Sequence, residues 1–133
     1  MRGTEWIVDA RGCDPSALRE AERLQAVFDR LVGLLKLTPI AAAARHTFPP
    51  PGGITGFLLL AESHLACHTF PEFGSLCLDI FCCRARPEVE VAEVADIAQA
   101  VSEVLGATDV QVRLVEREYG PATASNPSAV LAP

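Results

Sequence analysis

Apolar residues recur at two periods along this chain, and the change of period separates strands from helices. Residues 4–10 alternate between apolar and polar side chains, which is typical of a strand with one buried face. Asp14 and Pro15 then provide an N-cap and a proline for the first turn of a helix. An apolar stripe follows at three-to-four-residue spacing, formed by Leu18, Ala21, Leu24, Val27, Phe28, Leu31 and Leu35. It predicts one helix that faces a sheet and ends at Thr38-Pro39.

The middle of the chain predicts four strands separated by turns. Four alanines in residues 40–48 favour a helix, but the position before a Pro-Pro-Pro-Gly-Gly turn at 49–53 favours a strand, and we predict a strand. The unbroken apolar run at 54–61 predicts a central strand buried on both faces. Residues 65–70 and 75–83 are expected to be further strands, connected through residues 70–74.

The last third of the chain predicts one more helix and one more strand. Valines, alanine and leucine on one face of residues 89–105 indicate a helix that Gly106 ends. Residues 109–115 alternate like a strand, and 121–133, rich in Pro, Ala and Ser, are expected to be a disordered tail. Two helices and about six strands predict an α+β fold of one domain, residues 1–120. Its architecture would be a two-layer sandwich of a mostly antiparallel sheet with both helices on one face.

Composition narrows the class of protein. At 133 residues, half of them apolar, the chain has room for one core and an apolar surplus that favours a subunit interface. The net charge is −6 without a basic cluster, so we expect no nucleic-acid partner. No apolar run is long enough to cross a membrane, and Glu5 and Asp9 lie where a signal peptide would be apolar. With an odd number of cysteines, five, we expect a soluble protein in the reducing cytoplasm.

Strand alternation predicts the geometry of a polar cluster after residue 61. His68 and Phe70 should share one face of their strand while Cys67 points to the other. On the next strand, Cys83 should lie on one face together with Cys77, Asp79 and Phe81, with Cys82 opposite. Polar side chains at the end of a buried strand are costly unless they are paired, so we interpret the cluster as a reaction centre. We expect His68 and Cys83 to border one pocket that begins at Ser63.

Four motifs in order resemble one enzyme family. They are Gly53-Ile54-Thr55-Gly56, Glu62-Ser63-His64-Leu65, His68-Thr69-Phe70-Pro71-Glu72-Phe73-Gly74 and Asp79-Ile80-Phe81-Cys82-Cys83. Together with the Gly12-Cys13-Asp14-Pro15 helix start, they resemble the small prokaryotic S-adenosylmethionine decarboxylases over residues 5–118. That family makes its own pyruvoyl cofactor from an internal serine, here Ser63, without a metal or pyridoxal phosphate. The single lysine, Lys36, then needs no catalytic role.

The resemblance implies a self-cleaving proenzyme. Ser63 Oγ would attack the Glu62 carbonyl, His68 would act as the processing base and Thr55 would assist. Cleavage between Glu62 and Ser63 would leave a β chain, 1–62, and an α chain, 63–133, that begins with the pyruvoyl group. Two such protomers are expected to form an (αβ)2 dimer of four layers in which two sheets face each other.

The resemblance also implies the reaction and the substrate contacts. The pyruvoyl group at residue 63 would form a Schiff base with S-adenosylmethionine and release carbon dioxide, and Cys83 would protonate the substrate carbon. The product would supply aminopropyl groups for spermidine biosynthesis. Glu72 would accept hydrogen bonds from the ribose hydroxyls. Phe70 and Phe48 would sandwich the adenine, and their rings would also attract the sulfonium cation.

Departures from the family pattern keep a second substrate class open. Phe70 replaces a common tryptophan, Thr55 a common serine, Cys82 a frequent threonine and Arg84 a frequent glycine; the proline loop before Gly52 is one residue longer. Decarboxylation of arginine or ornithine by the same pyruvoyl group is therefore the alternative.

Three other readings explain less of the chain. A serine hydrolase would need a Gly-x-Ser-x-Gly elbow, which is absent around Ser63. A metal-binding module built from His46, His64, Cys67, His68 and Cys83 is opposed by the alternation of Cys67 and His68. A non-catalytic partner subunit would be favoured by loss of Ser63, His68 or Cys83, and all three are present.

Overall fold

Residues 1–84 and 90–122 are described by a computed structural model of the chain, without the side chains of residues 90–92. In chain order the elements are β1 (Arg2–Arg11), α1 (Pro15–Leu18), α2 (Ala21–Leu35), β2 (Ala44–Thr47), β3 (Ile54–Leu59), β4 (Ser63–Phe70), the 3-10 turn η1 (Pro71–Phe73), β5 (Ser75–Cys82), α3 (Glu90–Leu105) and β6 (Asp109–Glu118). The strands form a six-stranded sheet in the order β2-β3-β4-β5-β1-β6, and every neighbouring pair is antiparallel. The predicted α+β class is confirmed.

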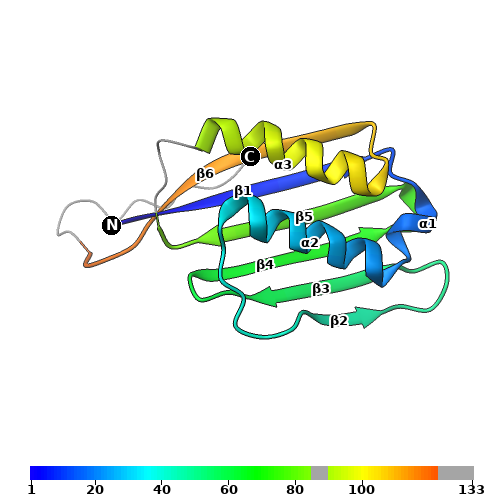
Figure 1. The fold of residues 1–133 in the computed structure, drawn as a ribbon, viewed down its shortest axis with the longest axis horizontal. Helices are drawn as coiled ribbons and strands as arrows, with labels where there is room; N and C mark the ends of the chain where they lie inside the picture. Colours follow the sequence, from blue (N-terminus) through cyan, green and yellow to red (C-terminus); the bar gives the residue numbers. More distant parts are fainter. Residues whose placement is uncertain (85–89, 123–133) are drawn as a thin grey trace.

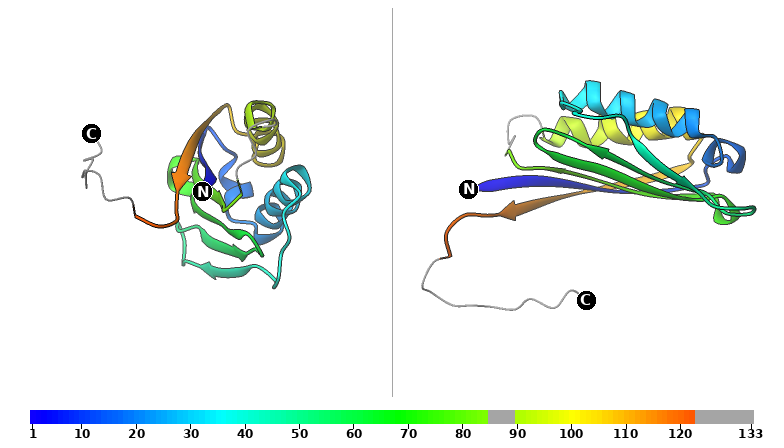
Figure 2. Two further views of the ribbon diagram at one scale, coloured as in Figure 1. Left: turned by 90° about the vertical axis from the view of Figure 1, so that its left-hand side faces the viewer. Right: turned by 90° about the horizontal axis from the view of Figure 1, so that it is seen from below.

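The molecule has two layers, with the helices α2 and α3 side by side on one face of the sheet (Figures 1 and 2). Side chains that alternate along the strands point into this helix-covered layer, including Trp6, Leu58, Leu65 and Ile80. They pack against α2 residues such as Phe28, Leu31 and Leu35, so burial of apolar surface holds the two layers together. We call the other side the exposed face of the sheet, because no helix or strand of the described residues covers it in Figure 2.

The predicted first helix is divided in two. Its start is as expected: Asp14 accepts a hydrogen bond from the Ser16 amide at 3.0 Å, and Pro15 follows. The helix then ends at Leu18, and Glu20 takes an extended conformation before α2 begins. The buried Leu18 carbonyl accepts a hydrogen bond from the hydroxyl of Thr69 at 2.9 Å. This contact with a distant strand satisfies the carbonyl at the point where the helix ends. Helix propensity depends on neighbouring residues, so it does not predict the contact.

Two predicted strands differ in extent and environment. The strand predicted over 54–61 is neither central nor buried on both faces: β3 ends at Leu59, lies next to the edge strand β2, and exposes Phe57 (42%) and Leu59 (45%). The helices cover only one side of the sheet, so the apolar run has a second, uncovered face. Residues 40–48 contribute only the short strand Ala44–Thr47, all of it exposed.

The remaining elements follow the predictions closely. The second predicted helix is observed from Glu90, and its expected first residue, Val89, lies outside the described residues. Gly106 ends it with φ +68° and an amide hydrogen bond to the Ser102 carbonyl. Most of the expected tail, from residue 123 on, also lies outside the described residues. No helix among those described is long and apolar enough to span a membrane.

Candidate active site

A tight turn joins β3 to β4 and contains the predicted cleavage bond. The Leu60 amide donates to the Ser63 carbonyl at 3.0 Å, which closes the turn around Ala61 and Glu62. Ser63 is the first residue of β4 and pairs with Cys82 of β5. The bond between Glu62 and Ser63 therefore lies where a turn meets a strand that neighbours hold on both sides.

The Glu62 carbonyl receives two contacts that favour attack on its carbon. The hydroxyl Oγ of Ser63 donates to this carbonyl oxygen, so the nucleophile lies beside the group that it would attack. The Cys83 amide donates to the same oxygen at 3.3 Å. A fixed N–H donor stabilises the negative charge that develops on a carbonyl oxygen during acyl transfer. The Cys83 backbone is itself held, since the Tyr119 hydroxyl donates to its carbonyl at 2.7 Å.

The segment after α2 fixes the turn from its other side. The Thr38 amide donates to the Glu62 side chain, at Oε1, over 3.2 Å, and the Ala61 amide donates to the Thr38 carbonyl at 2.8 Å. Sequence reasoning assigned Thr38 only to the end of a helix and Tyr119 to nothing. Neither carries a local signal, because both contacts join segments that are distant in the chain. We call Leu60–Ser63 together with Cys83 the cleavage end.

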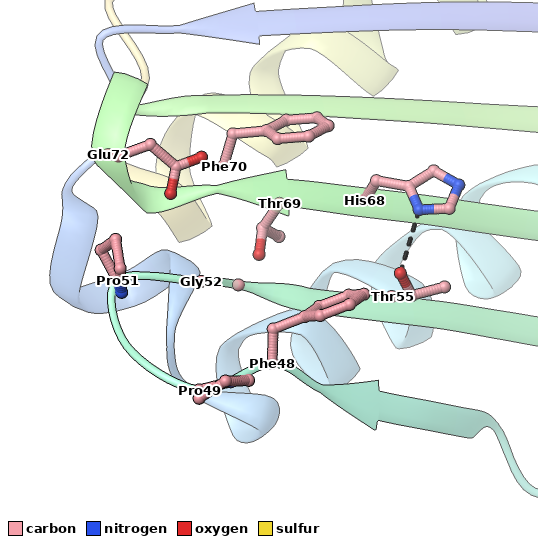
Figure 3. Close-up of a pocket in the computed structure, with 10 residues that line it drawn as sticks. Phe48, Pro49, Pro51, Gly52, Thr55, His68, Thr69, Phe70 and Glu72 are labelled. Carbon is pink, nitrogen blue, oxygen red and sulfur yellow. Dashed lines mark hydrogen bonds between the residues drawn. The ribbon is translucent and has the colours of Figure 1, made fainter.

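The second group of predicted residues lines a cavity of about 450 Å³ on the exposed face. Figure 3 shows Phe48 and Phe70 on opposite sides of it, with Glu72 towards one end and His68 towards the other. The Thr55 hydroxyl and His68 Nδ1 are joined by a hydrogen bond of 3.1 Å (Figure 3). We call Phe48, Thr55, His68, Phe70 and Glu72 the pocket end. The structure therefore brings five of the predicted site residues together in one place.

Thr69 and Gly53 build the wall of this cavity, although sequence reasoning gave them no role. The buried Thr69 hydroxyl accepts a hydrogen bond from the Ile54 amide at 2.8 Å while it donates to α1. Gly53 lies so close to Thr69 that an added Cβ would be 2.2 Å from the Thr69 carbonyl oxygen. Only glycine permits this approach of the proline loop to β4, so the glycine motif is the signal that points to it.

The prediction that His68 and Cys83 border one pocket beginning at Ser63 is wrong for a single chain. The described lining of the cavity includes His68 but neither Ser63 nor Cys83. In the strand register His68 lies opposite Cys77, whereas Cys83 bonds across to Glu62. His68 and Ser63 are five residues apart on one extended strand, roughly 17 Å from Cα to Cα. The structure thus separates the predicted residues into two ends of β4.

Cysteine positions follow the predicted alternation. Cys67 and Cys82 are buried under the helices, Cys77 is exposed on the opposite face of the sheet, and Cys83, directly after β5, is half-buried. Burial raises the pKa of Cys67 to about 12, so this thiol remains protonated at neutral pH. Burial raises the pKa of Cys77 as well, and the Asp9 carboxylate adds to the effect. Because Cys67 and His68 point to opposite faces, they cannot bind one metal ion together, and no cluster of three or more metal-binding side chains occurs among the described residues.

The profile of the protein family described as S-adenosylmethionine decarboxylase matches residues 4–118. The S-adenosylmethionine decarboxylase proenzyme of Thermococcus kodakarensis is 36% identical over 92 residues, which are 67% of this chain and 62% of that protein. The chain thus spans less than two thirds of the length of this relative. S-adenosylmethionine decarboxylase proenzyme 2 of Halalkalibacterium halodurans is 32% identical over 126 residues, which are 94% of this chain and 93% of the relative.

A solved structure has the same fold. It is the crystal structure of the adenosylmethionine decarboxylase from Aquifex aeolicus, with a TM-score of 0.70 and 24% sequence identity. The superposition covers 93% of this chain and 97% of that one. The two-layer arrangement of this sheet and its helices is therefore one that an experimental structure also adopts.

Proposed function

This chain belongs to the S-adenosylmethionine decarboxylase family, and on that premise we propose that it is a self-processing enzyme that removes the carboxyl group of S-adenosylmethionine. The observation that supports this most is the cleavage end, where the Ser63 hydroxyl contacts the Glu62 carbonyl and the Cys83 amide donates to it. We place the reaction in the cytoplasm, since all five cysteines are free thiols, as in a reducing compartment.

Self-processing begins with the bond between Glu62 and Ser63. Ser63 Oγ attacks the Glu62 carbonyl carbon, the C–N bond breaks, and the hydroxyl proton passes to the freed amine, which leaves an ester. Removal of the proton from the α carbon of residue 63 then expels the Glu62 carboxylate and leaves dehydroalanine. Addition of water releases ammonia and leaves a pyruvoyl group. The close contact of Ser63 with this carbonyl fits the chemistry, so the residues present suit the group that the family uses.

The base that removes the α proton of residue 63 cannot come from the same cleavage end. His68 is the candidate base, because imidazole exchanges protons near neutral pH, but in one chain it is roughly 17 Å along β4 from Ser63. The pocket end lies on the exposed face of the sheet, and the cleavage end lies at the other end of β4. A two-fold axis between two such faces would place the cleavage end of one protomer against the pocket end of its partner. We therefore propose an (αβ)2 dimer with two composite active sites.

The exposed face has the composition that such a dimer needs. Its aromatic and aliphatic side chains include Phe48, Phe57, Leu59 and Phe70, each between 38% and 48% exposed. Apolar side chains that cluster on one surface are typical of an interaction site. Stacking of two sheets would bury these side chains and form four layers, with helices on both outer sides. The arrangement supports the dimer that the sequence analysis predicted.

The pocket end suits the adenosyl part of the substrate. Two phenylalanine rings on opposite sides of the cavity, at Phe48 and Phe70, provide flat apolar surfaces for a purine (Figure 3). Glu72 lines the same cavity and is exposed, so its carboxylate accepts hydrogen bonds from ribose hydroxyls. Arginine and ornithine have no such ring, and the two facing phenylalanines favour S-adenosylmethionine over them.

The pyruvoyl group supplies an electron sink for decarboxylation once it has captured the substrate amine. The rest depends on the chain's own side chains. Cys83 belongs to the cleavage end through its backbone amide, and its thiol would return a proton to the substrate carbon. Glu72 and the two rings hold the nucleoside and so keep the reacting carbon near residue 63.

Two measurements on purified protein test the proposal. Mass spectrometry should detect chains 1–62 and 63–133, with a keto-acyl group in place of an amino terminus on the second. Carbon dioxide released from S-adenosylmethionine, arginine and ornithine should come from the first alone. A persistent uncut chain would contradict the processing, and release from arginine or ornithine alone would contradict only the substrate.

Mixing two inactive variants tests the composite site. Cys83→Ala removes a residue of the cleavage end and Glu72→Gln one of the pocket end. In a mixed dimer, one site would carry both changes and the other neither, so co-expression should restore about a quarter of wild-type activity. If each site were built within one protomer, the mixture would remain as inactive as its parents.

A further inference from the structure

Residue 63 changes from a doubly tethered residue to a singly tethered one when the chain is cut. Before cleavage it is held by the peptide bond to Glu62 and by the turn that the Leu60 amide closes. After cleavage the amide to His64 is its only covalent connection to the protein. The orientation of the new keto-acyl end therefore depends in part on what holds His64, a residue to which neither the proposed reaction nor the resemblance assigns a role.

The His64 ring is held from three sides. On β3, the Phe57 ring stacks against it with centroids 5.7 Å apart and planes at 22°. On β5, the Phe81 ring lies 6.0 Å away on its other neighbouring strand. Its Nε2 is also 3.5 Å from the Asp79 carboxylate, which pairs with it when the imidazole is protonated. All these side chains project from the exposed face of the sheet.

The contacts around His64 continue across the sheet beyond Phe81. The Arg117 guanidinium lies over the Phe81 ring, 5.4 Å from its centroid, and forms an ion pair with Glu5. A cation over an aromatic face is attracted to it electrostatically. Phe81 is therefore fixed from its far side as well, and it cannot easily swing away from His64. The half-buried His64 ring is therefore held by neighbours that are themselves held.

We propose that His64 is a positioning residue, clamped by Phe57, Phe81 and Asp79, that orients the keto group of residue 63 towards the substrate amine. This inference rests on the proposed function, since it requires the keto group to form. Before cleavage the turn holds residue 63, so the clamp should matter little for the cut itself. After cleavage, loss of the clamp lets the keto group rotate about the bonds of its single tether.

The test measures the reactivity of the keto group with two probes, of which only one requires a particular orientation of that group. Phenylhydrazine is small and reacts with a ketone in any orientation, and its product is followed by absorbance. Reductive trapping of S-adenosylmethionine by cyanoborohydride requires the keto group to face the bound substrate, and it is followed as added mass on chain 63–133. In His64→Ala we expect normal cleavage, a phenylhydrazine rate within about twofold of wild type and a trapping rate about tenfold lower.

Milder variants separate orientation from packing. Asp79→Asn keeps every ring in place and removes the ion pair, so trapping should fall about threefold while phenylhydrazine is unaffected. Asp109→Asn is the matched control: it breaks a comparable exposed ion pair, with Arg11 at 2.9 Å, away from His64, and should change neither rate. If His64→Ala does not fold, Phe57→Leu replaces it with the same expectation.

The outcomes are distinct. Wild-type trapping in folded His64→Ala or Phe57→Leu would overturn the inference, and so would a folded variant that fails to cut or one in which both probes slow equally. A wild type that is never cut would instead overturn the proposed function, together with this inference.

Discussion

The two ends of β4 have different proposed functions and are built from different parts of the chain. The cleavage end is built mainly from backbone: amides of Leu60 and Cys83 and the carbonyl of Thr38 fix a turn of four residues. The pocket end is built from side chains that project from one face of the sheet, among them His68 and Phe70. A reacting peptide bond must be held by its own main chain, whereas a substrate must be recognised by side chains. Variants at the two ends should therefore fail in different ways.

The largest expected effect is the loss of cleavage in Ser63→Ala. Alanine lacks the hydroxyl that contacts the Glu62 carbonyl, so the acyl shift has no nucleophile. We expect one band of 14.2 kDa on a denaturing gel, where wild type gives two of about half that mass. Ser16→Ala, which changes an exposed serine in α1, is the control and should be cut normally. Two bands from Ser63→Ala would place the cut elsewhere.

A smaller loss, confined to turnover, is expected for Cys83→Ala. Its amide donates to the Glu62 carbonyl through the backbone, so the cut should proceed. Loss of the thiol should reduce kcat by about 10²–10⁴, the range of a missing acid-base group. Cys77→Ala is the matched control, because Cys77 is an exposed thiol on β5, the strand that ends immediately before Cys83. Equal rates for the two variants would remove Cys83 from the proposed role.

Stability distinguishes the two faces of the sheet instead of the two ends of β4. Thr69→Val leaves the Ile54 amide and the Leu18 carbonyl without their buried partner, so we expect a loss of about 1–3 kcal/mol in the free energy of unfolding. Thr55→Val, on the exposed face, should change it by less than about 0.5 kcal/mol. Urea unfolding in a Ser63→Ala background keeps each protein a single chain. Equal losses would show that the Thr69 hydroxyl contributes little.

The smallest expected effect is at Lys36, which ends α2 and leads to Thr38. Its φ is +53°, a left-handed conformation that costs a residue with a Cβ about 1 kcal/mol, whereas glycine adopts it freely. Lys36→Gly should raise the free energy of unfolding by about 0.5 kcal/mol in the same assay, since glycine also gains freedom in the unfolded chain. Lys36→Ala keeps the Cβ and should show no gain. Cleavage should proceed normally in both.

Several features were predictable because they depend on neighbours in the chain. The two-residue period of a strand is a local property of the backbone, so alternation placed His68 and Phe70 on one face and Cys67 on the other. The same rule separated Cys82 from Cys83. The apolar stripe of the first helix identified the residues that pack on the sheet, and Asp14 with Pro15 identified where that helix begins.

Other features depend on which distant segments meet. The hydroxyl of Thr69 accounts for the break after Leu18, 51 positions earlier, and Thr38 anchors Glu62 across 24 positions. The apolar run at β3 predicted burial on both faces, but the helices that the structure describes cover only one. Periodicity within a strand does not report what lies over it, because coverage is decided by packing between elements.

The sequence by itself determined the class of fold, the side of each strand on which a residue lies and the motifs of the family, since these follow from local backbone geometry and residue type. Only the tertiary structure decided how far apart the candidate residues are. The register between β4 and β5 places His68 opposite Cys77 and leaves Cys83 beside Glu62. Register is set by cross-strand hydrogen bonds and core packing between segments that are separate in sequence, so alternation alone cannot supply it.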